Sequence, residues 1–194
     1  MREENKIKHA LFTKENKPVA FSPEVLGKIR DLIKRYPEGQ QKSALLPVLH
    51  MAQEELGGYL SVDVMDYVAS LLSVRPIEVY EVATFYSMFY ITPVGKFVIE
   101  VCRTGPCAIS GGEHTLHHLE EKLKIKTGET TPDGLFTLKT VECLGSCGTA
   151  PVMQVNTRFY ENLTSEKVEQ ILEDLKKSAD KPINEEEKWA ASFC

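Results

Sequence analysis

Several features that would direct a chain to a membrane, to the secretory route or onto nucleic acid are missing from this sequence. The opening residues, Met1 to Lys6, contain none of the apolar core of a secretory signal, and no apolar run approaches the roughly 18 residues of a membrane-spanning helix. Lys and Arg number 23 against 28 Asp and Glu, so the formal net charge is −5. This balance argues against binding nucleic acid through a basic face. We therefore expect a soluble protein with no direct membrane insertion and no nucleic-acid partner.

Cysteine is also scarce, because the chain has only five, and one is left over after any pairing. With no secretion signal the compartment is expected to be reducing, which disfavours disulfides and favours metal binding or redox use of the thiols. The hydrophobic fraction of 42% and the charged fraction of 26% are ordinary for a globular protein, and 194 residues suffice for one or two domains.

The first half of the chain has the periodicity of amphipathic helices. Ser22-Pro23-Glu24 combines an N-cap residue, a proline for the first turn and an acid, and Ser61 can cap a later helix. A helix over 42–56 is expected to begin late, because Pro47 is tolerated only in a first turn. A further helix is expected from Pro76 to Phe89. Four helices with short connections predict a small bundle.

In the second half the periodicity changes from helical to alternating, beginning at the Thr-Pro-Val-Gly sequence of residues 92–95. Strands are expected at 96–102, 135–142 and 152–156, with helices at 112–124 and 165–177. This β-α-β-β-α order predicts an α/β sandwich of thioredoxin type. The predicted fold is α+β, with an arm at 1–20, a helical bundle domain at 21–92, a thioredoxin-like domain at 93–177 and a tail at 178–194.

Four of the cysteines form two pairs, and each pair follows a short apolar, β-branched run. Cys102 and Cys107 are separated by four residues, and Cys143 and Cys147 by three. A strand would bring the first thiol of each pair to the end of a sheet, and a loop rich in Gly and Pro would turn the second thiol back. Two such loops side by side would place four sulfurs around one small group.

Three kinds of group compete for these thiols. Structural zinc sites typically use tighter spacings, and thiol–disulfide exchange usually needs C-x-x-C, whereas ferredoxins use such four-residue spacings around a [2Fe–2S] cluster. The spacing favours iron–sulfur and leaves zinc and redox thiols as alternatives. Gly105, Gly145 and Gly148 allow backbone N–H groups to turn toward sulfur, and Arg103 adds a positive charge.

The segments around the cysteines closely resemble a known family. They match the thioredoxin-like [2Fe–2S] subunit of respiratory complex I, which is called the E subunit in bacterial NADH:quinone oxidoreductase and flavoprotein 2 in mitochondria. The resemblance covers residues 22–177. The segments that carry it are Leu56–Leu60, Val79–Tyr86, Cys102–Cys107, Gly128–Gly134 and Val141–Asn156.

The resemblance implies that Cys102, Cys107, Cys143 and Cys147 hold one [2Fe–2S] cluster. It also implies an electron-transfer subunit of an NADH dehydrogenase, partnered with a flavoprotein subunit that binds FMN and NADH. Such an assembly lies on the cytoplasmic side of the bacterial inner membrane, or on the matrix side in mitochondria. Because no Gly-rich dinucleotide fingerprint follows a strand, we expect no NADH site and no catalysis from this chain alone.

Other interpretations stay open at this point. The same subunit could belong to an NAD-linked hydrogenase or formate dehydrogenase, and a stand-alone ferredoxin or a zinc-stabilised structural module are further alternatives.

Single residues outside the cysteine pairs have expected places as well. His114 and His118 have the spacing of a metal clip, but the leucines of their helix define its buried face, so we expect both histidines to face solvent or an interface. The apolar run 85–90 exceeds one helix face, so part of it is expected in the bundle core and part at a contact. Pro151 lies where thioredoxin-like folds often have a cis proline, and Cys194 is expected to be a free thiol.

Overall fold

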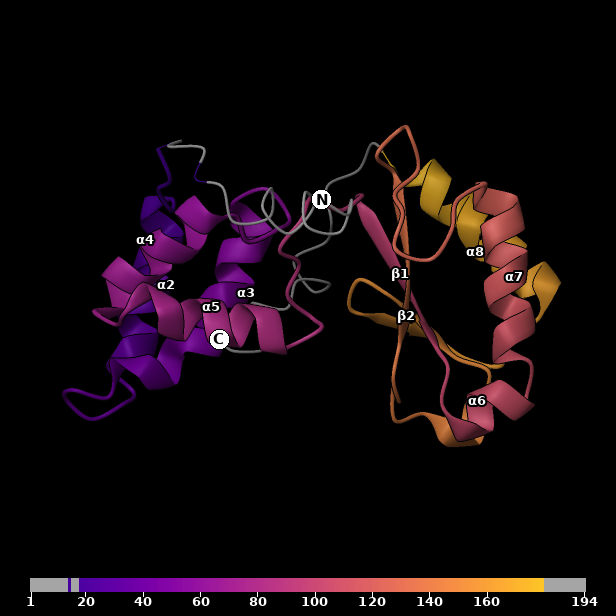
Figure 1. Cartoon of the computed structure of the whole chain (residues 1–194), viewed down its shortest axis with the longest axis horizontal. Helices are drawn as coiled ribbons and strands as arrows, with labels where there is room; N and C mark the ends of the chain where they lie inside the picture. The colour runs from indigo at the N-terminus through magenta and orange to yellow at the C-terminus, as the bar shows by residue number, and fades with distance from the viewer. Residues whose placement is uncertain (1–13, 15–17, 180–194) are drawn as a thin grey trace, which may run out of the picture. The chain divides into compact units, whose positions relative to one another are not determined.

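The computed structural model describes residue 14 and residues 18–179, and it separates into two compact units (Figure 1). One contains the described residues up to Pro93, and the other contains the described residues from Val94 onward. Cys194 lies outside the described residues. Within the part of the chain that the structure describes, no helix combines the length and apolar character needed to cross a membrane.

The first unit is helical, and its helices begin where the capping residues predict. The hydroxyls of Ser22 and Ser61 accept hydrogen bonds from the backbone N–H groups of Val25 at 3.4 Å and Val64 at 3.3 Å, which confirms both caps. The elements are α2 (Pro23–Ile33), η1 (Gln41–Ala44), α3 (Leu45–Glu55), α4 (Val62–Leu72) and α5 (Pro76–Phe85). Side chains that are fully buried between them include Ile29, Leu49, Met65, Val68 and Val79.

The fourth predicted helix is shorter than its sequence pattern indicates. α5 ends at Phe85, and Tyr86 already has an extended backbone, so the expected continuation to Phe89 is wrong. The side chain of Gln53 in α3 explains the difference: its amide donates to Met88 O at 3.1 Å, and its carbonyl oxygen accepts from Tyr90 N at 2.7 Å. These two bonds give hydrogen-bond partners to backbone groups that lie beyond the end of α5.

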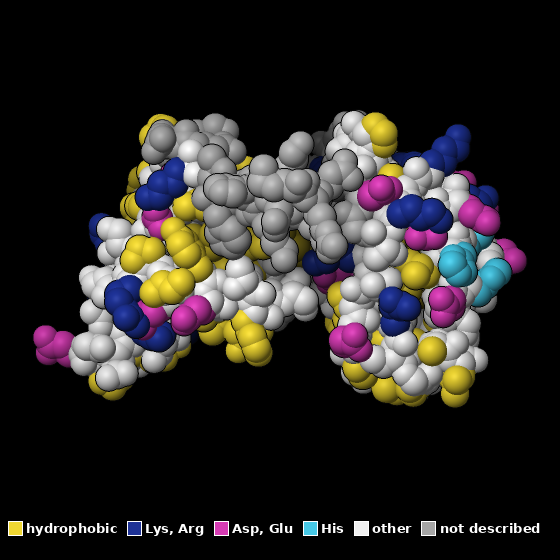
Figure 2. All heavy atoms as spheres, viewed as in Figure 1, with side chains coloured by type: hydrophobic (Ala, Val, Ile, Leu, Met, Phe, Trp, Pro, Cys, Tyr) yellow, Lys and Arg dark blue, Asp and Glu magenta, His cyan; other side chains and the backbone are white. Residues whose placement is uncertain are grey.

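The apolar run that follows α5 is divided between core and surface. Phe89 is buried and its ring lies 4.8 Å from that of His50, centroid to centroid. Phe85 is 78% exposed and Tyr86 39% exposed. Apolar side chains are visible on the surface of the first unit below α5 (Figure 2).

The second unit is a four-stranded mixed sheet with two helices on one face (Figure 1). The strand order is β2-β1-β3-β4, with β1 and β2 parallel and the other neighbours antiparallel. Its elements are β1 (Phe97–Cys102), α6 (Gly105–Ile109), α7 (Gly112–Leu123), β2 (Phe136–Val141), η2 (Cys147–Thr149), β3 (Met153–Val155), β4 (Arg158–Tyr160) and α8 (Ser165–Lys177). The predicted β-α-β-β-α order is present, and the structure adds α6 and β4 to it.

Alternate residues of β1 point to α7 and α8 and form the core of this unit. Phe97, Ile99 and Val101 pack with Leu119 of α7 and Val168 of α8. The added elements α6 and β4 are five and three residues long, too short to show a helical or alternating period. The peptide bond between Ala150 and Pro151 is cis.

The buried His50 predicts a loss of stability in mild acid. Burial lowers the pKa of His50 to about 4, from 6.5. Between these two pH values the unfolded chain binds a proton that the folded chain excludes. The free energy of unfolding is therefore highest above pH 6.5 and decreases as the pH falls towards 4, by up to about 3 kcal/mol. We expect the urea midpoint to decline over this range, and His50→Leu to remove that part of the slope. His117→Asn, at an exposed histidine of α7, is the control and should keep it. Equal slopes in wild type and His50→Leu would contradict the assignment.

Candidate functional site

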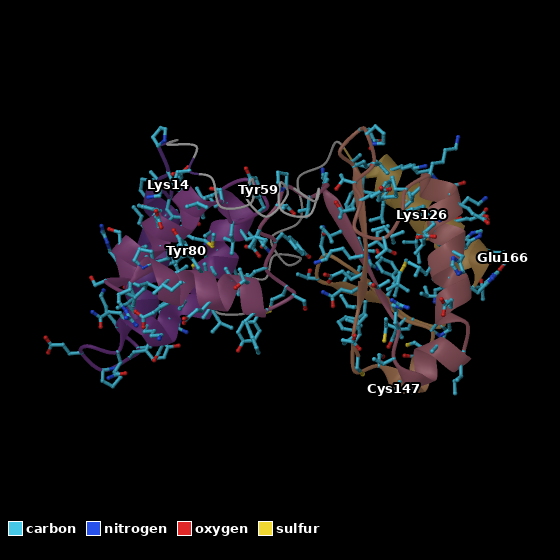
Figure 3. The ribbon with its side chains drawn as sticks, in the orientation of Figure 1. Lys14, Tyr59, Tyr80, Lys126, Cys147 and Glu166 are labelled. Carbon is cyan, nitrogen blue, oxygen red and sulfur yellow. The ribbon has the colours of Figure 1, made fainter. Side chains whose placement is uncertain are left out.

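The two cysteine loops leave the sheet at the same edge. Cys102 is the last residue of β1 and pairs in register with Val141, the last residue of β2. Because parallel strands end at the same edge of a sheet, the loops that follow emerge together. The loop after β1 places Cys107 in α6, and the loop after β2 carries Cys143 and Cys147. Figure 3 shows Cys147 at the end of the unit where Figure 1 labels α6.

The four sulfurs form two pairs that differ in exposure. Cys102 and Cys107 are 2% and 3% exposed, whereas Cys143 and Cys147 are exposed. The Sγ atoms of Cys143 and Cys147 are 4.0 Å apart. Two thiolates bound at about 2.3 Å to one tetrahedral metal atom would be about 3.8 Å apart, so this pair has the spacing of two ligands on one metal.

Hydrogen-bond donors surround the sulfurs and link the two loops. The backbone N–H of Gly145, whose φ is +81°, donates to Cys143 Sγ at 3.3 Å and is the main cause of the lowered pKa of that thiol. At Cys102 burial acts to raise the pKa, but hydrogen bonds from Thr104 and from the backbone of Leu144 outweigh it, and the net shift is downward. Leu144 belongs to the second loop, so this bond joins the loops directly.

The partner sulfur of each pair is shifted in the opposite direction. Burial raises the pKa of the Cys107 thiol, and the hydrogen bond with Cys143 raises the pKa of Cys147. Each pair therefore has one thiol whose pKa is lowered and one whose pKa is raised. Donors directed at sulfur offset the negative charge that thiolate ligands accumulate around a metal cluster. The arrangement suits a group that binds two pairs of thiolates.

Two further residues of this site were not predicted from the sequence. Thr104 Oγ1 lies 3.4 Å from Cys102 Sγ and also interacts with Cys143. Gly112, the first residue of α7, lies so close to the first loop that a Cβ atom there would be 2.8 Å from Cys107 O and 3.1 Å from Cys102 O. Neither role has a sequence signal, because both depend on contacts formed only in the fold.

The remaining candidates have local roles in this unit. Gly105 begins α6 and Gly148 lies in η2, so each is part of a short helix. Histidine side chains gather on the surface over α7 (Figure 2), where His114 Nε2 is 3.2 Å from Ser165 Oγ and His118 Nε2 is 3.3 Å from Glu169 Oε1. Within residues 14 and 18–179, no group of three or more His, Cys, Asp or Glu side chains converges as a single-ion site requires.

A family and a set of relatives match this chain. The model of the thioredoxin-like [2Fe–2S] ferredoxin family matches residues 29–176, so the chain belongs to that family. The E subunit of the NADH-quinone oxidoreductase of Rickettsia felis is 46% identical over 154 residues, 79% of this chain and 92% of that protein. The mitochondrial NADH dehydrogenase [ubiquinone] flavoprotein 2 of Dictyostelium discoideum is 42% identical over 162 residues, 84% of this chain and 66% of that protein.

The solved structures show the same fold. An NAD+-reducing [NiFe]-hydrogenase in its H2-reduced state aligns with a TM-score of 0.62 at 22% identity, over 72% of this chain and 24% of that chain. This chain therefore spans about a quarter of the matched hydrogenase chain, and the likeness concerns the fold alone.

These findings confirm the resemblance inferred from the sequence. The α+β, thioredoxin-like fold and one [2Fe–2S] cluster as cofactor are those of the family. The assignment of Cys102, Cys107, Cys143 and Cys147 as its ligands stays a prediction, which the two sulfur pairs and their hydrogen-bond donors fit.

The close approach at Gly112 predicts a selective defect in cofactor retention. Gly112→Ala places a methyl group against the backbone carbonyls of both cysteines of the first loop, so the loop must shift. We expect iron content to fall to less than about half of wild type while far-UV circular dichroism stays similar.

Gly105→Ala is the matched control, because a Cβ there meets nothing within 4 Å. It changes a glycine in the same loop without a clash and should keep full iron content. If both variants keep full iron content, the steric argument is wrong.

Proposed function

We propose that this chain is the [2Fe–2S] electron-transfer subunit of the NADH dehydrogenase module of a respiratory complex I. The observation that carries the proposal is the set of two cysteine loops at the shared end of β1 and β2, inside the region that matches the family. Cys102 and Cys107 would bind one iron, and Cys143 and Cys147 the other. When bound, a [2Fe–2S] cluster supplies a site that takes up and releases one electron at a time.

The surrounding residues have separate tasks in this proposal. Thr104 and the backbone N–H groups of Leu144 and Gly145 donate to sulfur and offset negative charge. Val152 packs against the buried pair and keeps water from that side. No part of this task requires the chain to bind NADH itself.

The exposed thiol pair indicates where a redox partner approaches. Cys143 and Cys147 lie at the surface, and Ile109 at the end of α6 is 89% exposed. Apolar side chains gather at the end of the second unit where α6 lies (Figure 2). An electron donor can come nearest to the cofactor from this side. We propose a flavoprotein that binds FMN and NADH as this donor, in an assembly on the cytoplasmic side of a bacterial inner membrane or the matrix side in mitochondria.

The relatives support complex I over an NAD-linked hydrogenase as the host. E subunits of NADH-quinone oxidoreductases reach 44–46% identity over about four fifths of this chain, whereas the hydrogenase likeness has 22–23% identity. A likeness at that level is one of fold and does not distinguish among the functions that share it.

Metal analysis tests the cofactor and its ligands. Chain purified without oxygen should contain two irons and two acid-labile sulfides, and dithionite should produce the paramagnetic signal of a reduced [2Fe–2S] centre. Serine at any of the four proposed ligands should lower iron content and alter or abolish the signal. Cys194→Ser is the matched control and should resemble wild type. One zinc with no sulfide would overturn the proposal in favour of a structural module.

Purification from the native host tests the assembly. An affinity tag on the chain should retain an FMN-containing protein together with membrane subunits of a quinone reductase, and NADH should reduce the purified complex. Tagged Cys143→Ser measures whether assembly depends on the cofactor. Recovery of a hydrogenase or formate dehydrogenase catalytic subunit, with no membrane subunits, would refute the complex I assignment.

A further inference from the structure

The second cysteine loop is held on both sides of Cys147 by one carboxylate. Glu161 directly follows β4, and its Oε1 atom accepts a hydrogen bond from Ser146 Oγ and another from Thr149 Oγ1, the latter at 2.6 Å. Ser146 immediately precedes Cys147, and Thr149 is the last residue of η2. The side chain of Glu161 therefore bridges the two flanks of the cysteine.

A separate set of backbone bonds positions the segment that carries Glu161. Asn162 N donates to Thr149 O at 2.7 Å, and Leu163 N donates to Pro151 O at 3.2 Å. These bonds do not involve the carboxylate, so the segment after β4 would remain beside the loop in its absence. The carboxylate adds a specific attachment for the part of the loop that contains Cys147.

The carboxylate of Glu161 differs from a neutral acceptor because it brings a negative charge to the loop. An ionised carboxylate can only accept, so the hydroxyls of Ser146 and Thr149 are the donors in both bonds to Glu161. Ser146 Oγ and Thr149 Oγ1 are also 2.8 Å apart, and Thr149 Oγ1 lies 3.1 Å from Ser146 O, so without the carboxylate both hydroxyls would bond within the loop. The bonds from Ser146 and then Thr149 lower the pKa of Glu161, so it is charged at neutral pH. A fixed negative charge is thus attached to the loop of the exposed thiol pair.

We infer that Glu161 is a positioning residue for the Cys143–Cys147 loop, and that its charge lowers the reduction potential of the cluster held there. Reduction adds negative charge to the cluster, and a fixed negative charge nearby disfavours that addition. The inference rests on the proposed function, because it requires the cluster at these cysteines.

Four variants separate attachment from charge. Glu161→Gln keeps an acceptor oxygen and removes the charge, whereas Glu161→Ala removes both. The double variant Ser146→Ala/Thr149→Val removes the hydroxyls and keeps the charge. Glu173→Gln is the matched control, because it removes the same charge from an exposed carboxylate of α8 that pairs with Lys177.

Two measurements on the full chain, purified without oxygen, give independent readouts. Iron release to a chelator should be at least roughly tenfold faster in Glu161→Ala and in the double variant, because each loses two hydrogen bonds to a charged group and the loss of one alone corresponds to about tenfold. The midpoint potential from a reductive titration followed by electron paramagnetic resonance should rise in Glu161→Gln and stay at the wild-type value in Glu173→Gln.

Several outcomes overturn the inference. Wild-type iron release in Glu161→Ala removes the positioning role, and an equal potential shift in Glu161→Gln and Glu173→Gln removes the local charge effect. If wild type itself holds no [2Fe–2S] cluster, the proposed function fails instead. In that case, amide hydrogen exchange over residues 144–149 still tests whether the Glu161 carboxylate holds the loop. Faster exchange in Glu161→Ala than in wild type supports this role, and unchanged exchange refutes it.

Discussion

The parallel pairing of β1 with β2 is the constraint on which the site depends. It aligns Cys102 with Val141, so both cysteine loops begin at one level of the sheet. A shift of two residues along β2 would displace one loop by about 7 Å and separate the sulfur pairs. The apolar core between the sheet and its helices fixes this register. A slip of one residue would move side chains to the opposite face of the strand and place a charged residue such as Glu100 in that core. The same packing that stabilises the domain therefore sets the geometry of the site.

The loops themselves are held by contacts from three directions. α7 begins so close to the first loop that only Gly112 fits, Leu144 donates a hydrogen bond from the second loop to a sulfur of the first, and Glu161 secures the second loop from beyond β4. Each of these contacts comes from an element that the sheet has already placed. The scaffold thus restricts where the thiols can lie, which reduces the ordering that binding requires.

Much of this arrangement follows from local sequence, and the rest follows only from the tertiary structure. The serine caps of the first unit, the alternating strands and the cysteine spacings are local signals. They predicted where α2 and α4 begin and that each cysteine pair follows a strand, and they favoured an iron–sulfur group over zinc or redox thiols. The end of α5 depends on Gln53, a residue of another helix, and the roles of Gly112 and Glu161 depend on approaches between distant segments. Such residues have no periodicity or motif to reveal them, although they determine how closely the site is held.

The unequal burial of the two thiol pairs gives the site an inner and an outer side. The first pair is enclosed, whereas the second faces solvent. In the proposed site, a chelator or an oxidant that arrives from solvent would therefore meet Cys143 and Cys147 before the enclosed pair. The outer loop would then set how readily the site is attacked, and the enclosed pair would be the last to be reached.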